Sequence, residues 1–95
     1  MKLFKDINFK NHPYANGVIG TLDLGDGLVL SVVQGDGLYG NAKDNTFEIA
    51  LFNGDDYVPL DDYEDVMGWQ TPDQIDAILT KIQKNSQKFL KLLND

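Results

Sequence analysis

The chain has 95 residues, contains no cysteine, carries a net charge of −7, and has eight basic residues, all of them lysines. A chain of this length forms one domain, and the lack of cysteine excludes disulfides, thiol nucleophiles and cysteine-ligated metals. Because arginine is the usual reader of phosphates and base edges, its absence from an acidic chain argues against direct nucleic-acid binding and against an anionic membrane surface as a partner.

Residues 1–16 are expected to form an N-terminal arm or a weak strand, because Leu3, Ile7 and Phe9 share one side if this segment is extended. The segment from His12 to Gly17 has the composition of a turn. No apolar segment of the kind found in signal peptides follows Lys2, so we expect a cytoplasmic protein.

Residues 17–69 are expected to form an antiparallel sheet of three to four strands. The strand segments are 17–24, 28–33, 46–52 and 57–60. The first alternates apolar and polar residues, and Asp26-Gly27 suits a tight hairpin turn. Residues 28–33 are apolar on both faces, which is typical of a central strand. Pro59 cannot donate to a ladder, so the last strand is expected at an edge.

Residues 71–93 are expected to form an amphipathic helix. Thr71 and Gln74 fit a capping box, with Pro72 at the first helical position. Apolar residues then recur at helical spacing, namely Ile75, Ile78, Ile82, Phe89 and Leu93. The predicted fold is therefore a single α+β domain over 1–95, a three- to four-stranded antiparallel meander with one C-terminal amphipathic helix packed on one face.

The sequence predicts no catalytic residue, no cofactor and no metal ligand, so we expect a non-enzymatic protein. His12 is the only histidine, and no nucleophile pattern surrounds it. The glycine-rich segments 25–27 and 35–40 join strand to strand, whereas a phosphate loop leads into a helix. No segment has the ligand spacing of a calcium loop, which leaves a weak site of another type as the remaining alternative.

The segment from Asp44 to Thr80 contains no lysine, arginine or histidine. The candidate partner-binding residues fall within it, and they are Asp55, Asp56, Tyr57, Asp61, Asp62, Tyr63, Glu64 and Asp65. One interpretation is a solvated acidic face that keeps the domain soluble. The other is a docking surface for a basic protein, with the tyrosines as anchors. Codon bias in an A+T-rich genome would equally explain the absence of arginine.

Two short runs resemble small phage and prophage proteins of unassigned function. They are Gly37-Leu38-Tyr39-Gly40 through Phe47-Glu48-Ile49-Ala50, and Asp65-Val66-Met67-Gly68-Trp69-Gln70-Thr71-Pro72, and the resemblance covers about residues 28–82. It implies a phage or mobile-element origin rather than an activity. Together with the charge, it leads to the hypothesis of an acidic protein that docks on a basic host protein in the host cytoplasm and inhibits it.

The alternative hypothesis is a homo-oligomeric structural or virion-accessory protein with no host target. Residues 28–33 are apolar on both sides, whereas one helix covers only one face of a sheet. The second face would then be covered by another copy of the chain, as in a homodimer.

Overall fold

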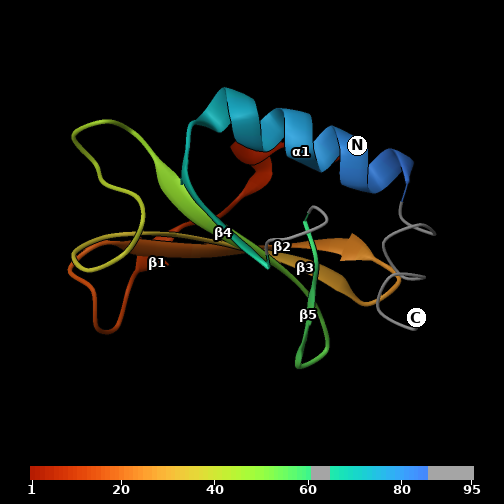
Figure 1. Ribbon diagram of the computed structural model, residues 1–95, viewed down its shortest axis with the longest axis horizontal. Coiled ribbons are helices and arrows are strands. Elements are labelled where there is room, and N and C mark those ends of the chain that lie inside the picture. Colours follow the sequence, from red (N-terminus) through yellow and green to blue (C-terminus); the bar gives the residue numbers. More distant parts are fainter. Residues whose placement is uncertain (61–64, 86–95) are drawn as a thin grey trace.

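The computed structural model describes residues 1–60 and 65–85, and it shows one antiparallel sheet with a single α-helix on one face (Figure 1). The α+β class, the antiparallel sheet and the C-terminal helix are therefore confirmed. The elements are the 3-10 helix η1 (Phe4–Asp6), the strands β1 (Lys10–Asn11), β2 (Val18–Gly25), β3 (Leu28–Gln34), β4 (Phe47–Asn53), β5 (Asp56–Val58) and β6 (Val66–Gln70), and the helix α1 (Pro72–Lys84).

The described residues form a sheet of six strands, so the prediction of three to four strands was wrong. The two strands that the predicted count left out are β1, which lies within the expected arm or weak strand of residues 1–16, and β6, whose residues 66–69 have only the character of a short extended segment. β1 has only two residues, too few for any alternation to be visible. β6 contains Gly68, and its pairing with β4 is irregular between Phe47 and Ile49, so its apolar residues do not alternate regularly.

The strands β2, β3 and β4 form the centre of the sheet. Asp26 and Gly27 join β2 to β3 with φ angles of 55° and 82°, the left-handed conformation that a tight hairpin turn needs. β3 is central, as predicted, and every second side chain along it is buried, from Leu28 to Gln34.

The strands β5 and β6 share one side of β4. Leu51 of β4 pairs with Val58 of β5, and the preceding residue, Ala50, pairs with Val66 of β6. The two short strands therefore continue one another along the same edge.

The helix α1 begins as predicted. The Thr71 hydroxyl accepts from the Gln74 N–H at 3.3 Å, and the Gln74 side chain accepts from the Thr71 N–H at 2.9 Å, which is a complete capping box. The helix ends at Lys84, earlier than the predicted 71–93, because Asn85 leaves helical backbone angles. Residues 86–93 of the predicted helix lie outside the described residues.

The apolar side of α1 covers one face of the sheet. Ile75, Leu79 and Ile82 are buried, and Ile78 packs at the margin of the same core. Leu79 was absent from the predicted stripe, although its position is one turn beyond Ile75 and therefore on the same side. Phe89 and Leu93, which the stripe also included, lie outside the described residues.

The N-terminal arm is fastened to α1. The Phe4 N–H donates to the Asp76 carboxylate at 2.7 Å, and the Lys2 N–H donates to the Gln83 side chain at 2.9 Å. Phe4 and Phe9 also pack their rings against Phe47, with centroids 5.2 and 5.5 Å away. The arm therefore closes the core beside the helix rather than extending the sheet along its whole length.

The other face of the sheet carries no element of the described chain (Figure 1). Residues that alternate with the core positions lie on this face, and we call five of them, Ile19, Val29, Val33, Glu48 and Phe52, the open sheet face. They pair across the three central strands: Ile19 with Val33, Val33 with Glu48, and Val29 with Phe52. All five are half-buried.

Candidate partner-binding site

The described part of the predicted acidic surface lies at the turn between β4 and β5. Asp55, Asp56 and Tyr57 are exposed there. Gly54 has a φ of 63°, which suits it to this reversal. Asp65 is exposed as well, directly before β6. The other four predicted residues, 61–64, lie outside the described residues.

The register of the sheet brings these acids to one edge. Asp56 lies opposite Asn53, and Val66 lies opposite Ala50. Three residues of strand span about 10 Å, so Asp56 and Val66, the residue that follows Asp65, are separated by roughly that distance along the outer side of β4. The structure therefore brings together the exposed predicted residues that it describes.

A further acid at this end was not among the predicted residues. The Asn53 side chain donates to the backbone oxygen of Asp26 at 3.2 Å, which joins the β2–β3 turn to the β4–β5 turn. Asp26 is exposed. The signal was present in the sequence, because in a meander the first and third hairpin turns lie at the same end. We call Asp26, Asp55, Asp56, Tyr57 and Asp65 the acidic edge.

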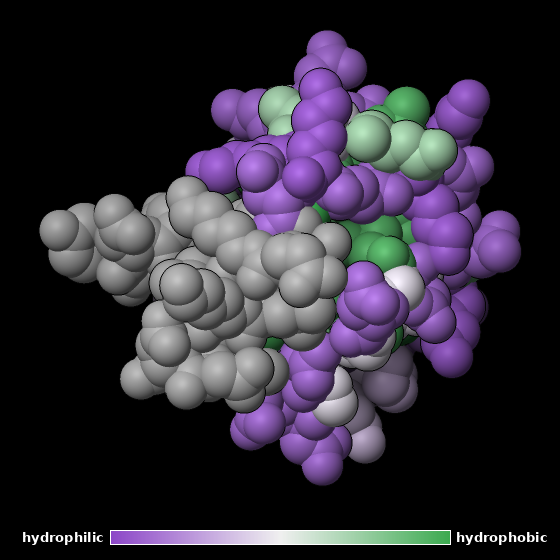
Figure 2. All heavy atoms as spheres, turned by 90° about the vertical axis from the view of Figure 1, so that its right-hand side faces the viewer, coloured by the Kyte–Doolittle hydropathy of each residue, from purple (hydrophilic) through white to green (hydrophobic). Residues whose placement is uncertain are grey.

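Figure 2 shows the end of the molecule at which β2 and β3 are joined. Hydrophilic residues dominate the described surface there and surround a smaller hydrophobic patch. The β2–β3 turn therefore lies at a largely polar end of the molecule.

Tyr57 gives the acidic edge an aromatic group. It lies opposite Phe52 across the β4–β5 ladder, with ring centroids 4.6 Å apart, and it is 50% exposed. A cross-strand aromatic pair holds both rings in place. Tyr57 therefore presents a fixed, half-exposed ring between the acids and the open sheet face, as expected of an anchor residue in a protein interface.

A second exposed aromatic pair was not predicted as a site. Tyr39 and Trp69 are 61% and 54% exposed, and their ring centroids are 6.2 Å apart. The pair joins the β3–β4 loop to β6. Only the fold brings these residues together, because thirty positions of sequence separate them.

His12 has a structural role in its turn. Its Nδ1 accepts from the N–H groups of Tyr14 and Ala15, each at 3.1 Å. The imidazole ring therefore accepts the hydrogen bonds of two N–H groups in the turn in place of a backbone carbonyl. No feature of these contacts activates His12 for proton transfer or for nucleophilic chemistry.

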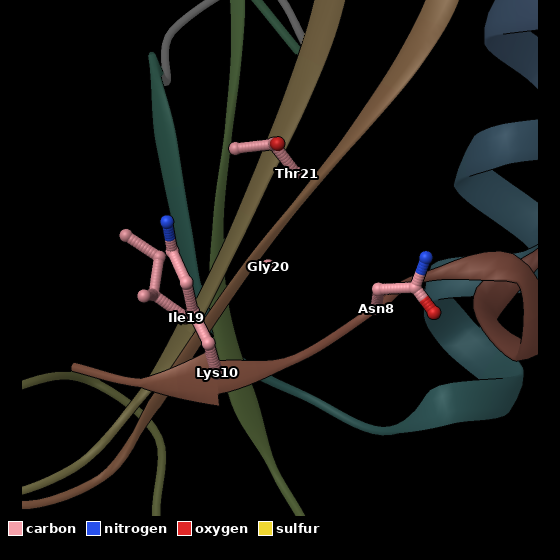
Figure 3. A pocket seen from close by; sticks show the side chains of 5 residues that line it. All are labelled: Asn8, Lys10, Ile19, Gly20 and Thr21. Atoms are coloured by element: carbon pink, nitrogen blue, oxygen red, sulfur yellow. The ribbon is translucent and has the colours of Figure 1, made fainter.

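A shallow pocket of about 390 Å³ lies where β1 and β2 diverge. Asn8, Lys10, Ile19, Gly20 and Thr21 line it (Figure 3). Lys10 and Ile19 are paired, and their side chains lie together, whereas Asn8 lies on the divergent part of the chain. With one lysine as its only charged group, the pocket has no pair of groups for acid–base or nucleophilic catalysis.

In the described ranges 1–60 and 65–85, no group of three or more histidine or acidic side chains is arranged to hold a metal ion. No helix in the same ranges is sufficiently long and apolar to cross a membrane.

Comparison with protein-family models found no matching family, and comparisons with curated proteins and with solved structures found no match either.

Proposed function

We propose that this protein is a non-enzymatic binding module that docks on a basic protein through its acidic edge. The observation that carries the proposal is the convergence of exposed carboxylates from two hairpin turns and from the start of β6, beside the half-exposed ring of Tyr57. A surface of one charge sign accelerates encounter with an oppositely charged partner and rejects partners of like charge.

The resemblance to small phage proteins extends the proposal to a biological setting. The partner is then a basic host protein in the host cytoplasm, and docking inhibits it by covering its positively charged surface. A nucleic-acid-binding protein fits this description, because phosphate contacts require such a surface. An acidic edge that competes for that surface needs no catalytic group of its own.

Charge reversal at the acidic edge tests the proposal. Immobilised wild-type protein and the double variant D55K/D56K are used to capture proteins from host lysate, and mass spectrometry quantifies what is retained. We expect basic proteins that the wild type retains and the variant loses. Equal recovery of the same proteins by both would contradict the proposal.

A matched control separates local charge from net charge. The triple variant D6K/N8K/A77K changes the net charge by the same amount, and its three exposed residues belong to the N-terminal arm and to α1, outside the acidic edge and the β3–β4 loop. We expect this control to retain most of the wild-type binding. If both variants lose the partners equally, the net charge is responsible and the acidic edge is not the site.

A second candidate function is supported by the open sheet face. This face carries three half-buried aliphatic residues, Ile19, Val29 and Val33, and no described element packs against it. An apolar sheet face is a common dimer interface, so we propose self-association as the alternative. Sedimentation equilibrium decides between the two, because a monomer at micromolar concentration contradicts the alternative.

A further inference from the structure

The aromatic pair of Tyr39 and Trp69 has a geometry that core packing does not explain. Both rings are more than half exposed, at 61% and 54%, so their burial contributes little to the stability of the fold. Large aromatic side chains that remain exposed on a small domain are unusual and often belong to interaction sites.

The backbone holds Trp69 in a conformation that bulky residues avoid. Its φ is 57°, and such a conformation costs about 1–3 kcal/mol in a residue other than glycine. The Trp69 N–H donates to the Tyr39 carbonyl at 2.6 Å, which fixes the strained residue to the β3–β4 loop. The strained residue lies where the pairing of β6 with β4 is irregular. Such irregularities change the direction in which side chains point.

Gly68 allows the loop to approach this closely. A Cβ atom at position 68 would lie 2.5 Å from the Tyr39 Cβ and 3.1 Å from the Tyr39 backbone oxygen. No real side chain tolerates the first distance. Tyr39 therefore packs directly on the Gly68 backbone, which brings the two rings to the same place on the surface.

A carboxylate is anchored beside the pair. The Tyr39 N–H donates to Glu48 Oε1 at 3.1 Å, and Glu48 belongs to the half-buried open sheet face. Glu48 lies between Phe47 and Ile49, where the pairing of β4 with β6 is irregular. Two aromatic rings and a fixed carboxylate are thus present together.

We infer that Tyr39, Trp69 and Glu48 form a site for the side chain of a lysine or arginine of the partner protein. Aromatic faces attract cations, most strongly tryptophan, and a carboxylate adds a charge-assisted hydrogen bond. The chain has no basic residue of its own between Asp44 and Thr80. The inference rests on the proposed function, because it describes how a basic side chain of the same partner would bind at a second place on the surface.

The position of the site agrees with one continuous binding surface. Glu48 and Asn53 are five residues apart on β4, or about 16 Å, and Asn53 pairs with Asp56 of the acidic edge. The aromatic pair and the acidic edge therefore lie along the same side of β4, at its two ends. A basic segment that follows this side would reach both.

Trp69 is the only tryptophan, so its fluorescence reports on the site directly. The probe is a short peptide of alternating arginine and glycine, and its control is the same peptide with citrulline, the uncharged isostere, in place of arginine. We expect the arginine peptide to change Trp69 emission saturably, with about ten-fold higher affinity than the citrulline peptide. Equal affinities of the two peptides would overturn the inference.

Two variants test the individual groups. Glu48→Gln keeps an acceptor for the Tyr39 N–H but removes the charge, and Tyr39→Leu removes one ring. We expect each to weaken arginine-peptide binding by about three- to ten-fold. Tyr14→Leu is the control, because Tyr14 is 93% exposed and lies outside the site. Circular dichroism verifies that all three variants fold.

The test distinguishes failure of this inference from failure of the proposed function. If D55K/D56K loses the host partner while Glu48→Gln and Tyr39→Leu bind the peptide and the partner as the wild type does, the acidic edge stands and the inference fails. If the peptide binds as expected but D55K/D56K retains the host partner, the site stands and the acidic edge fails.

Discussion

The two faces of the β3–β4 strand pair differ in what packs against them and therefore in how far their side chains are buried. On the face beneath α1, Leu30, Ile49 and Leu51 are completely buried. On the open sheet face, Val33 and Glu48 lie opposite each other and remain half-buried. The covered face therefore supplies most of the apolar burial that stabilises the fold, whereas no described element packs against the open sheet face.

The largest expected effect is on the covered face. Ile49→Ala removes a fully buried side chain, so we expect it to lower the free energy of unfolding by about 2–5 kcal/mol. Val33→Ala, on the open face, should cost less than about 1 kcal/mol because Val33 already contacts solvent. Urea denaturation measures both. Equal losses would show that the open face is covered in solution.

The next effect concerns the support of the aromatic pair. Gly68→Ala places a methyl group against Tyr39, and we expect a loss of about 1–3 kcal/mol together with a changed Trp69 emission spectrum. Tyr39→Gly removes the opposing Cβ atom. In that background the cost of Gly68→Ala should fall markedly, and an unchanged cost would show that Tyr39 is not the obstacle.

A smaller effect is expected at the start of α1. Thr71→Ala removes the hydroxyl that accepts from the Gln74 N–H, and the loss should be about 1 kcal/mol. Thr71→Ser keeps the hydroxyl and serves as the control. Thermal denaturation of the three proteins checks the order, and a serine variant as unstable as the alanine variant would argue against the capping role.

The smallest effect on stability is expected at Trp69 itself. Trp69→Gly removes an exposed ring and relieves the strained φ angle, so the free energy of unfolding should change by no more than about 1 kcal/mol, in either direction. Calorimetry should nevertheless show that the variant no longer distinguishes the arginine peptide from its citrulline control. A large loss of stability would assign Trp69 a structural role instead.

Features set by local chemistry were predictable from the sequence. The capping box at Thr71 and the turn at Asp26-Gly27 both depend on neighbouring residues alone, and both are present. The predicted acids Asp55, Asp56 and Asp65 are exposed at one edge, because the spacing of the hairpins already determined which turns share an end.

Features set by contacts between distant segments were not predictable. The extended character of residues 1–16 and 66–69 could be predicted, but the pairing of β1 with β2 and of β6 with β4 could not. The pairing of Tyr39 with Trp69 depends on the missing side chain of Gly68 and on an irregular ladder. A glycine beside a tryptophan in a strand-like segment was the single available signal, since glycine there often marks close backbone approach.

The dissociation constant of the captured host partner, measured in parallel for the wild type, D55K/D56K and D6K/N8K/A77K across a salt series, tests the acidic edge most directly. We expect D55K/D56K to bind at least about ten-fold more weakly at low salt, with a smaller salt dependence, while D6K/N8K/A77K stays close to the wild type. Identical dissociation constants for the wild type and D55K/D56K at every salt concentration would contradict this expectation.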